Sequence, residues 1–150
     1  MISVKRTTSD DIDFQKLIKE LDKDLAKKNG DKNDFFVQYN QIDVINHVVL
    51  AYEDEMAVGC GAYKQFDEET VEIKRMFVPI QHRRKGISRK ILNELELWAT
   101  NENYKFAVLE TGEQMSEAIG LYQSNGYEVI PNYPPYENEN TSICFKKIIK

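Results

Sequence analysis

The sequence has few of the residues and segments that mark a secreted, membrane-bound or metal-dependent protein. Its 150 residues include only two cysteines, Cys60 and Cys144, and their spacing fits neither a metal site nor a redox motif. We therefore expect both to be reduced core residues of a cytoplasmic protein that binds no metal. No apolar run approaches the roughly 18 residues that a membrane span needs, and the N-terminus lacks a signal-peptide pattern, so we expect no membrane association.

An excess of positive charge is also missing. The formal net charge is −5, which argues against nucleic-acid binding and fits a mild attraction for a cationic substrate. Neither of the two familiar phosphate loops, GxxxxGK[ST] and GxGxxG, is present. The length and the hydrophobic fraction of 41% are those of an ordinary globular protein and predict a single domain over residues 1–150.

The patterns that are present predict alternating strands and helices. We expect strands at residues 2–6, 47–52, 56–63, 71–78, 105–110, 127–130 and 142–149, and helices around residues 14–25, 86–100 and 116–124. This order predicts an α/β fold, in which a mixed β-sheet carries helices on both faces. A proline- and tyrosine-rich loop, NYPPYENEN (residues 132–140), is of the kind that often covers an active site. The aromatic residues Phe35, Phe36 and Tyr39 are either core residues or one wall of a substrate pocket.

The alternation of apolar residues slips within the strand at residues 71–78. Ile73 and Met76 are three residues apart and cannot share a face of a regular strand. One extra residue, a β-bulge near Met76–Val78, would restore the register. A bulge also frees backbone N–H groups from the ladder, so this segment is a candidate for ligand contacts.

A cluster of positive charge precedes the helix at residues 86–100. Arg83, Arg84 and Lys85 lie where a helix carries a partial positive charge and ordinarily attracts Asp or Glu. A bound phosphate would satisfy both these side chains and the free backbone N–H groups of the first turn. Gly86 lets the backbone approach a ligand closely. The alternative is a solvated charged surface, but the order of strand, turn, Arg-x-x-Gly-x-Ser and helix favours a phosphorylated cofactor.

RRKGIS, Arg83 to Ser88, resembles the R/Q-x-x-G-x-G/A signature of the GNAT acetyltransferases, which holds the pyrophosphate of acetyl-coenzyme A. EIKRMFV resembles the family's fourth strand, ILNELELWA the helix that follows it, and EAIGLYQSNGYEVI the second cofactor motif. The resemblance covers roughly residues 45–149 and implies a GNAT-like fold with acetyl-coenzyme A as co-substrate. It also implies these cofactor-binding residues: Met76, Phe77, Val78, Arg83, Arg84, Lys85, Gly86, Ile87, Ser88 and Tyr122.

Acetyl transfer from a thioester to an amine requires a base for the amine and an acid for the departing thiolate. Tyr122 falls on the family's tyrosine and is our candidate acid, since a phenol with a pKa of ~10 is neutral at pH 7. Two carboxylates compete to be the base. Glu72 matches a glutamate that some branches of the family use through an ordered water, and Glu110 matches the base of the ribosomal-protein branch. No Ser/His/Asp set or partnered cysteine is apparent, which favours direct attack in a ternary complex.

Three functions follow from this resemblance. The first is an acetyl-coenzyme A-dependent N-acetyltransferase for a small amine or amino-acid-like acceptor. The second is a protein or peptide acetyltransferase, which would need an open groove, and the loop at residues 132–140 argues mildly against one. The third is a non-catalytic acyl-coenzyme A sensor, which is favoured only if Tyr122 and both glutamates prove remote from the thioester.

The last predicted strand also suggests a homodimer. Ile143, Phe145 and Ile148 lie on it, and we expect them to be exposed at one end of the sheet. Such a strand can pair with a second copy of the chain.

Overall fold

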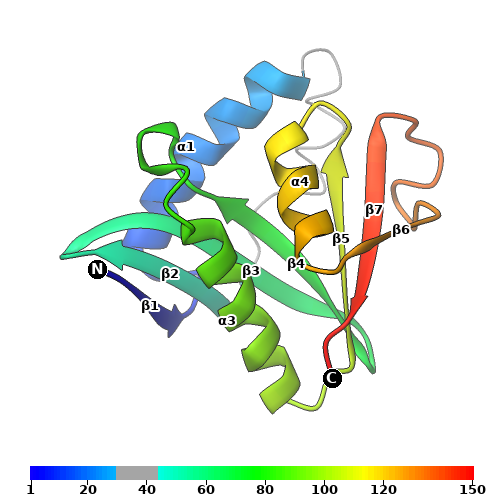
Figure 1. Ribbon diagram of the computed structural model, residues 1–150, viewed down its shortest axis with the longest axis horizontal. Coiled ribbons are helices and arrows are strands. Elements are labelled where there is room, and N and C mark those ends of the chain that lie inside the picture. Colours follow the sequence, from blue (N-terminus) through cyan, green and yellow to red (C-terminus); the bar gives the residue numbers. More distant parts are fainter. Residues whose placement is uncertain (30–43) are drawn as a thin grey trace. The chain divides into compact units, whose positions relative to one another are not determined.

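The computed structural model describes residues 1–29 and 44–150 of the chain (Figure 1). The described strands are β1 (Ile2–Thr7), β2 (His47–Glu53), β3 (Met56–Asp67), β4 (Thr70–Phe77), β5 (Phe106–Gly112), β6 (Glu128–Ile130) and β7 (Ser142–Ile148). The described helices are α1 (Ile12–Asn29), α3 (Ile87–Asn101), α4 (Ser116–Ser124) and a short 3₁₀ turn, η2 (Ile80–His82). The aromatic cluster Phe35, Phe36 and Tyr39 lies outside the described residues.

The strands form a mixed sheet. Hydrogen bonds join them in the order β1-β2-β3-β4-β5-β7-β6. β4 and β5 run parallel, whereas β1 with β2, β2 with β3, β5 with β7, and β6 with β7 are antiparallel. The mixed sheet and its helices confirm the predicted α/β fold.

The backbone divides into two compact units. The first consists of Met1–Lys64 and Lys74–Leu95, and the second of Gln65–Ile73 and Glu96–Lys150. Strands β3 and β4 and helix α3 each have residues in both units. A single domain over residues 1–150 stays a prediction.

In the first unit, helix α1 packs on one face of the strands. The helix begins after Asp11, whose carboxylate accepts the N–H of Asp13 at 3.0 Å and so satisfies a donor of the first turn. Apolar residues recur on α1 at spacings of three and four and pack against alternate residues of the strands. The resulting core consists of Phe14, Leu17, Ile18, Leu21, Ile45, Val48, Leu50, Cys60, Ala62 and Phe77.

Helix α3 packs on the opposite face of the same strands, where two glycines of β3 leave room for it. A Cβ on Gly61 would lie 2.5 Å from Sδ of Met76 and 2.8 Å from Cγ2 of Ile91. A Cβ on Gly59 would lie 2.9 Å from Cδ1 of Ile91. Real Cβ atoms are not found this close to their neighbours, so the seating of α3 depends on these glycines.

In the second unit, the end of helix α3 is held by a buried polar network. Glu96 Oε2 accepts the hydroxyl proton of Tyr127 at 2.8 Å, and Glu96 Oε1 lies 2.7 Å from Nζ of Lys147 on β7. Both oxygens of this buried carboxylate therefore have partners, which offsets the cost of removing it from water.

Most of the predicted elements are confirmed, but the predicted dimer surface is wrong in two respects. Strand β7 lies between β5 and β6 rather than at a sheet edge, and Phe145 is fully buried. β7 is an inner strand because β6 pairs with it, with Val129 opposite Phe145. The ring of Phe145 packs 6.0 Å from that of Tyr122 on α4, which accounts for its burial. Ile148 is exposed as expected, at 70%. Cys60 and Cys144 are both buried free thiols, as the sequence predicts.

Candidate active site

The turn between β4 and α3 begins with an arginine that binds the backbone. Nε of Arg83 donates to the carbonyl oxygen of Val78 at 2.7 Å. This bond spans η2 and closes the chain into a compact turn directly after β4. Arg83 therefore has a structural role in the turn, which the sequence pattern alone did not indicate.

The next residues place two left-handed conformations before the helix. Arg84 has a φ of 67° and Gly86 a φ of 76°. This conformation suits glycine but is unfavourable for arginine. Strained backbone conformations of this kind are often found at ligand-binding sites. A Cβ on Gly86 would meet nothing within 4 Å, so the space beside it is open. The first turn of α3 contains no acidic residue that would occupy its N-terminus. The turn therefore fits an anion such as a pyrophosphate.

Lys85 and His82 are further residues of this turn with distinct surroundings. Nζ of Lys85 lies 3.1 Å from Oε1 of Glu53 on β2, and this pair lowers the pKa of the Glu53 carboxyl. His82 adds a feature that the sequence analysis missed, since its Nδ1 is buried without a hydrogen-bond partner among the described residues. A buried donor or acceptor of this kind usually has a partner, so the unsatisfied Nδ1 is an unusual feature of this turn.

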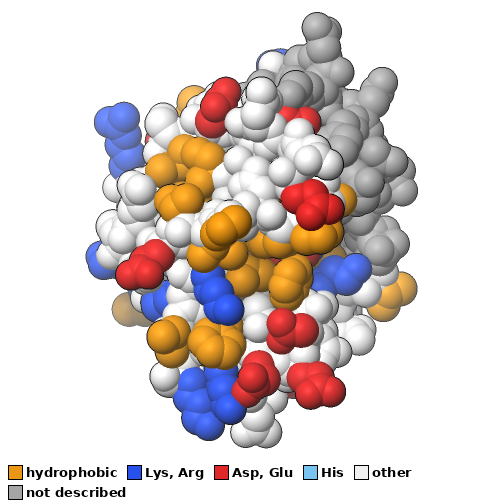
Figure 2. Space-filling view, turned by 90° about the vertical axis from the view of Figure 1, so that its right-hand side faces the viewer, with side chains coloured by type: hydrophobic (Ala, Val, Ile, Leu, Met, Phe, Trp, Pro, Cys, Tyr) orange, Lys and Arg blue, Asp and Glu red, His pale blue; other side chains and the backbone are white. Residues whose placement is uncertain are grey.

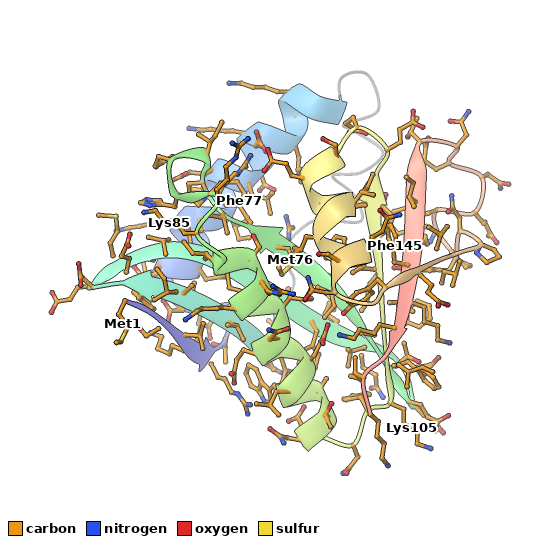
Figure 3. All side chains as sticks on the ribbon, in the orientation of Figure 1. Met1, Met76, Phe77, Lys85, Lys105 and Phe145 are labelled. Carbon is orange, nitrogen blue, oxygen red and sulfur yellow. The ribbon has the colours of Figure 1, made fainter. Side chains whose placement is uncertain are left out.

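The break in strand β4 lies one residue before the predicted bulge. Arg75 has a φ of 59°, a left-handed conformation in an otherwise extended segment. Its guanidinium is buried, and Nη1 lies 3.1 Å from Oδ1 of Asp22 on α1. Met76 and Phe77, labelled in Figure 3, then face opposite sides of the sheet. Because Phe77 belongs to the core against α1, a ligand would meet its backbone rather than its ring.

In the second unit, the two candidate bases share one face of the sheet. Glu72 on β4 lies opposite Val108 on β5, and Glu110 follows Val108 by two residues. Residues two apart on a strand, and residues directly opposite each other, point to the same face. Glu110 in turn lies opposite Cys144 on β7, so that thiol belongs to this face too. The structure thus brings together the two carboxylates between which the sequence could not choose.

Each of these carboxylates accepts a hydrogen bond from a hydroxyl group. Oη of Tyr133 donates to Oε2 of Glu72 at 2.8 Å, and Oγ of Ser142 donates to Oε2 of Glu110 at 2.7 Å. Burial raises the pKa of the Cys144 thiol to about 11, and the charges of Glu110 and Glu72 act in the same direction. Cys144 therefore stays a thiol at neutral pH and is no nucleophile.

Tyr122 lies on helix α4 and is buried. Its ring centroid lies 6.0 Å from that of Phe145 on β7, which is labelled in Figure 3, and 5.7 Å from that of Tyr127. Phe145 follows Cys144 and therefore points to the other face of β7, so the ring of Tyr122 packs against that face. Tyr122 is nevertheless close enough to Glu110 for the charge of that carboxylate to act on its hydroxyl group. Burial raises the pKa of Tyr122, and the charge of Glu110 raises it further. Tyr122 is therefore a neutral phenol at physiological pH, as a general acid must be.

The sequence analysis missed Asn132, Tyr133 and Ser142. The composition of residues 132–140 marked the loop as a possible cover of an active site but did not single out these side chains.

Within the described residues, no group of three or more His, Cys, Asp or Glu side chains could hold a metal ion. None of the helices in residues 1–29 and 44–150 has the length and apolar character that crossing a bilayer requires.

Comparisons with known proteins identify the family. The acetyltransferase (GNAT) domain profile matches residues 45–129. The uncharacterized N-acetyltransferase YsnE of Bacillus subtilis is 32% identical over 99 residues, which cover 65% of this chain and 66%, just under two thirds, of that protein. A Klebsiella pneumoniae protein assigned to the acyl-CoA N-acyltransferases has a similar structure, with a TM-score of 0.81 and 27% identity over 100% of this chain and 99% of that one.

A second similar structure is that of a GNAT family acetyltransferase from Elizabethkingia anophelis with acetyl-CoA bound. Its TM-score is 0.70 at 20% identity, over 98% of this chain and 97% of that one. At this identity the similarity shows the fold. The match to the domain profile confirms the family that the motifs at residues 83–88 and 117–130 indicated. The chain therefore belongs to the GNAT family of acetyltransferases, which are acyltransferase enzymes.

Proposed function

We propose that the chain is an acetyl-coenzyme A-dependent N-acetyltransferase that acetylates a small amine or amino-acid-like acceptor by direct attack. The observation that carries this proposal is the turn between β4 and α3. Its left-handed Arg84 and Gly86, the open space beside Gly86 and the absence of an acidic residue in the first turn of α3 suit a pyrophosphate. The acetyl-CoA bound to the similar Elizabethkingia anophelis protein supports this choice of co-substrate.

The residues of the turn have distinct proposed roles. The backbone N–H groups from Gly86 to Ser88 bind the pyrophosphate, while Arg84 and Lys85 supply positive charge. Arg83 holds the turn in shape through the carbonyl oxygen of Val78. The backbone of Met76 to Val78, just after the left-handed Arg75, binds the pantetheine arm. Bound acetyl-coenzyme A supplies the thioester that the acceptor attacks.

The proposed catalytic residues are those of the second unit. Glu72 or Glu110 takes the proton of the acceptor amine, directly or through a water, and Tyr122 protonates the departing thiolate. Both carboxylates are partly exposed and on one face, so they also attract a protonated amine before it is activated. The net charge of −5 supports a cationic acceptor in the same way.

A panel of small amines and amino acids, each mixed with acetyl-coenzyme A, tests this function. We expect release of free thiol, measured with a thiol reagent, for at least one amine and at a rate above that of the thioester alone. Lysine-containing peptides, tested in parallel, should be poorer substrates. Preference for the peptides would support a protein acetyltransferase instead, and coenzyme A binding without thiol release would support a sensor.

We also propose a cytoplasmic location, which the two buried free thiols support because the cytoplasm keeps thiols reduced. A homodimer is a further proposal, and static light scattering at tens of micromolar would test it. On the face turned to the viewer in Figure 2, hydrophobic side chains are interspersed with acidic and basic ones. A dimer contact on such a surface would be a mixed one.

A further inference from the structure

The segment at residues 131–142, which follows β6 and ends with the first residue of β7, supplies a hydroxyl group to each candidate base. Tyr133 near its start donates to Glu72 at 2.8 Å, and Ser142 at its end donates to Glu110 at 2.7 Å. Tyr133 is 9% exposed and Ser142 is 6% exposed, so both hydrogen bonds are largely shielded from water. Two carboxylates on different strands thus depend on one short segment of chain.

This segment is held together by the side chain of Asn132. Its Nδ2 lies 3.2 Å from the carbonyl oxygen of Tyr136, and 3.1 Å from those of Glu139 and Ser142. An amide nitrogen has only two protons, so the three carbonyls share them. Because these acceptors are spread along the segment, Asn132 fixes its beginning relative to its end.

Further contacts attach the segment to its surroundings in the second unit. The N–H of Glu113, just after β5, donates to the carbonyl oxygen of Thr141 at 2.8 Å. The ring of Tyr133 packs edge-on against those of Phe66, at 4.9 Å, and Tyr136, at 5.8 Å. Burial raises the pKa of Tyr133, and so does the charge of Glu72. The phenol therefore stays protonated and remains a hydrogen-bond donor to Glu72 at any physiological pH.

We propose that Tyr133 and Ser142 are positioning residues, which orient Glu72 and Glu110 for proton transfer from the acceptor amine. This inference rests on the proposed function. A hydrogen bond to one oxygen of a carboxylate fixes the rotation of the carboxylate plane and so the direction from which a proton is taken. Catalysis is sensitive to such orientation, since a misplacement of about 1 Å can cost roughly 10²-fold in rate. Neither hydroxyl needs to touch the substrate.

The test compares Tyr133→Phe and Ser142→Ala with wild type. Each change removes one hydroxyl, and Tyr133→Phe keeps the ring against Phe66. We expect the variant that lacks the hydroxyl bonded to the true base to lose about tenfold in kcat, with the KM for acetyl-coenzyme A unchanged. In a double variant with the corresponding Glu72→Gln or Glu110→Gln, we expect no further loss, because the hydroxyl acts through the carboxylate.

Tyr52→Phe is the matched control. Oη of Tyr52 donates to Oδ2 of Asp13 at 2.7 Å, so it makes the same kind of bond, within the first unit and outside the proposed machinery. It should lower thermal stability about as much as Tyr133→Phe and leave kcat unchanged. The proposal is overturned if neither Tyr133→Phe nor Ser142→Ala lowers kcat more than Tyr52→Phe does, or if their losses persist in the Gln double variants.

A second measurement separates this proposal from the proposed function. If wild type released no thiol with any amine, the function would be refuted but the positioning contacts would remain testable by ¹³C NMR of the glutamate side-chain carboxyls. We expect Tyr133→Phe to shift the Glu72 resonance and leave that of Glu110 in place, and Ser142→Ala to do the reverse. Resonances that do not move in either variant would overturn the positioning contacts themselves.

Discussion

A methyl group added at Gly61 should disturb the packing of helix α3 against strand β3. In Gly61→Ala, the new Cβ would meet Sδ of Met76 at 2.5 Å, Cγ2 of Ile91 at 2.8 Å and Cδ1 of Leu95 at 2.9 Å. The thioether of Met76 is flexible and can move aside. The two branched side chains belong to α3 and are fully buried, so they can retreat only if the helix shifts.

The expected cost follows from this crowding. Overpacking a well-filled core by one methyl group costs about 1–3 kcal/mol. For a chain of this length, each kcal/mol corresponds to about 2–4 °C in Tm. We therefore expect Gly61→Ala to lower the free energy of unfolding by about 1–3 kcal/mol in urea titrations and to lower Tm in calorimetry. Coenzyme A affinity should fall as well, since α3 carries the proposed pyrophosphate site at its start.

Gly120→Ala is the matched control for this prediction. Gly120 lies inside helix α4, where a Cβ would meet nothing within 4 Å. Alanine is a better helix former than glycine, so this change should stabilise the protein by about 0.5–1 kcal/mol. The packing argument is refuted if Gly61→Ala is as stable as wild type, or if the two substitutions change stability in the same direction.

Three further predictions concern proton transfer and pH. Tyr122→Phe should lower turnover by roughly 10²–10⁴-fold with coenzyme A affinity nearly intact, and unchanged turnover in steady-state assays would exclude Tyr122 as the acid. Of Glu72→Gln and Glu110→Gln, only the variant at the true base should lose the acidic limb of the pH–rate profile; if both limbs survive in both variants, no dedicated carboxylate base exists. Burial raises the pKa of the Cys60 thiol to about 12 from an ordinary value of 9.0, so the fold favours the neutral thiol. The contribution of this thiol to the free energy of unfolding is complete below about pH 9 and is lost as the pH rises toward 12. Urea titrations of wild type should show this loss of stability, and a smaller loss in Cys60→Ala would confirm that it comes from Cys60.

The sequence predicted the elements well because each has a strong local pattern. Helix α4 runs over Ser116–Ser124 as expected, since Asn125-Gly126, directly after it, is a typical helix stop. The alternation of apolar residues predicts an irregularity of β4 near Met76–Val78, but it occurs at Arg75. Alternation shows that the register changes within a strand, but it does not show which residue adopts the left-handed conformation.

The contacts of the candidate bases could not be predicted in the same way. Tyr133 and Glu72 are 61 residues apart, and Ser142 and Glu110 are 32 apart. Neither pair has a local pattern, because each depends on the pairing of β4 with β5 and of β5 with β7. The motifs located Glu72, Glu110 and Tyr122 along the chain, but only the strand register shows that the two glutamates share a face.

Calorimetric titration of coenzyme A tests the central claim most directly, namely that the turn at residues 83–88 holds the cofactor's phosphates. Wild type, Gly86→Trp, Arg83→Ala and Lys19→Trp, an exposed site on α1, should be compared at one ionic strength. We predict that Gly86→Trp abolishes binding, because its side chain fills the open space and strains a residue with a φ of 76°. Arg83→Ala should weaken binding, and Lys19→Trp should leave it unchanged. Normal coenzyme A affinity in folded Gly86→Trp would contradict the account.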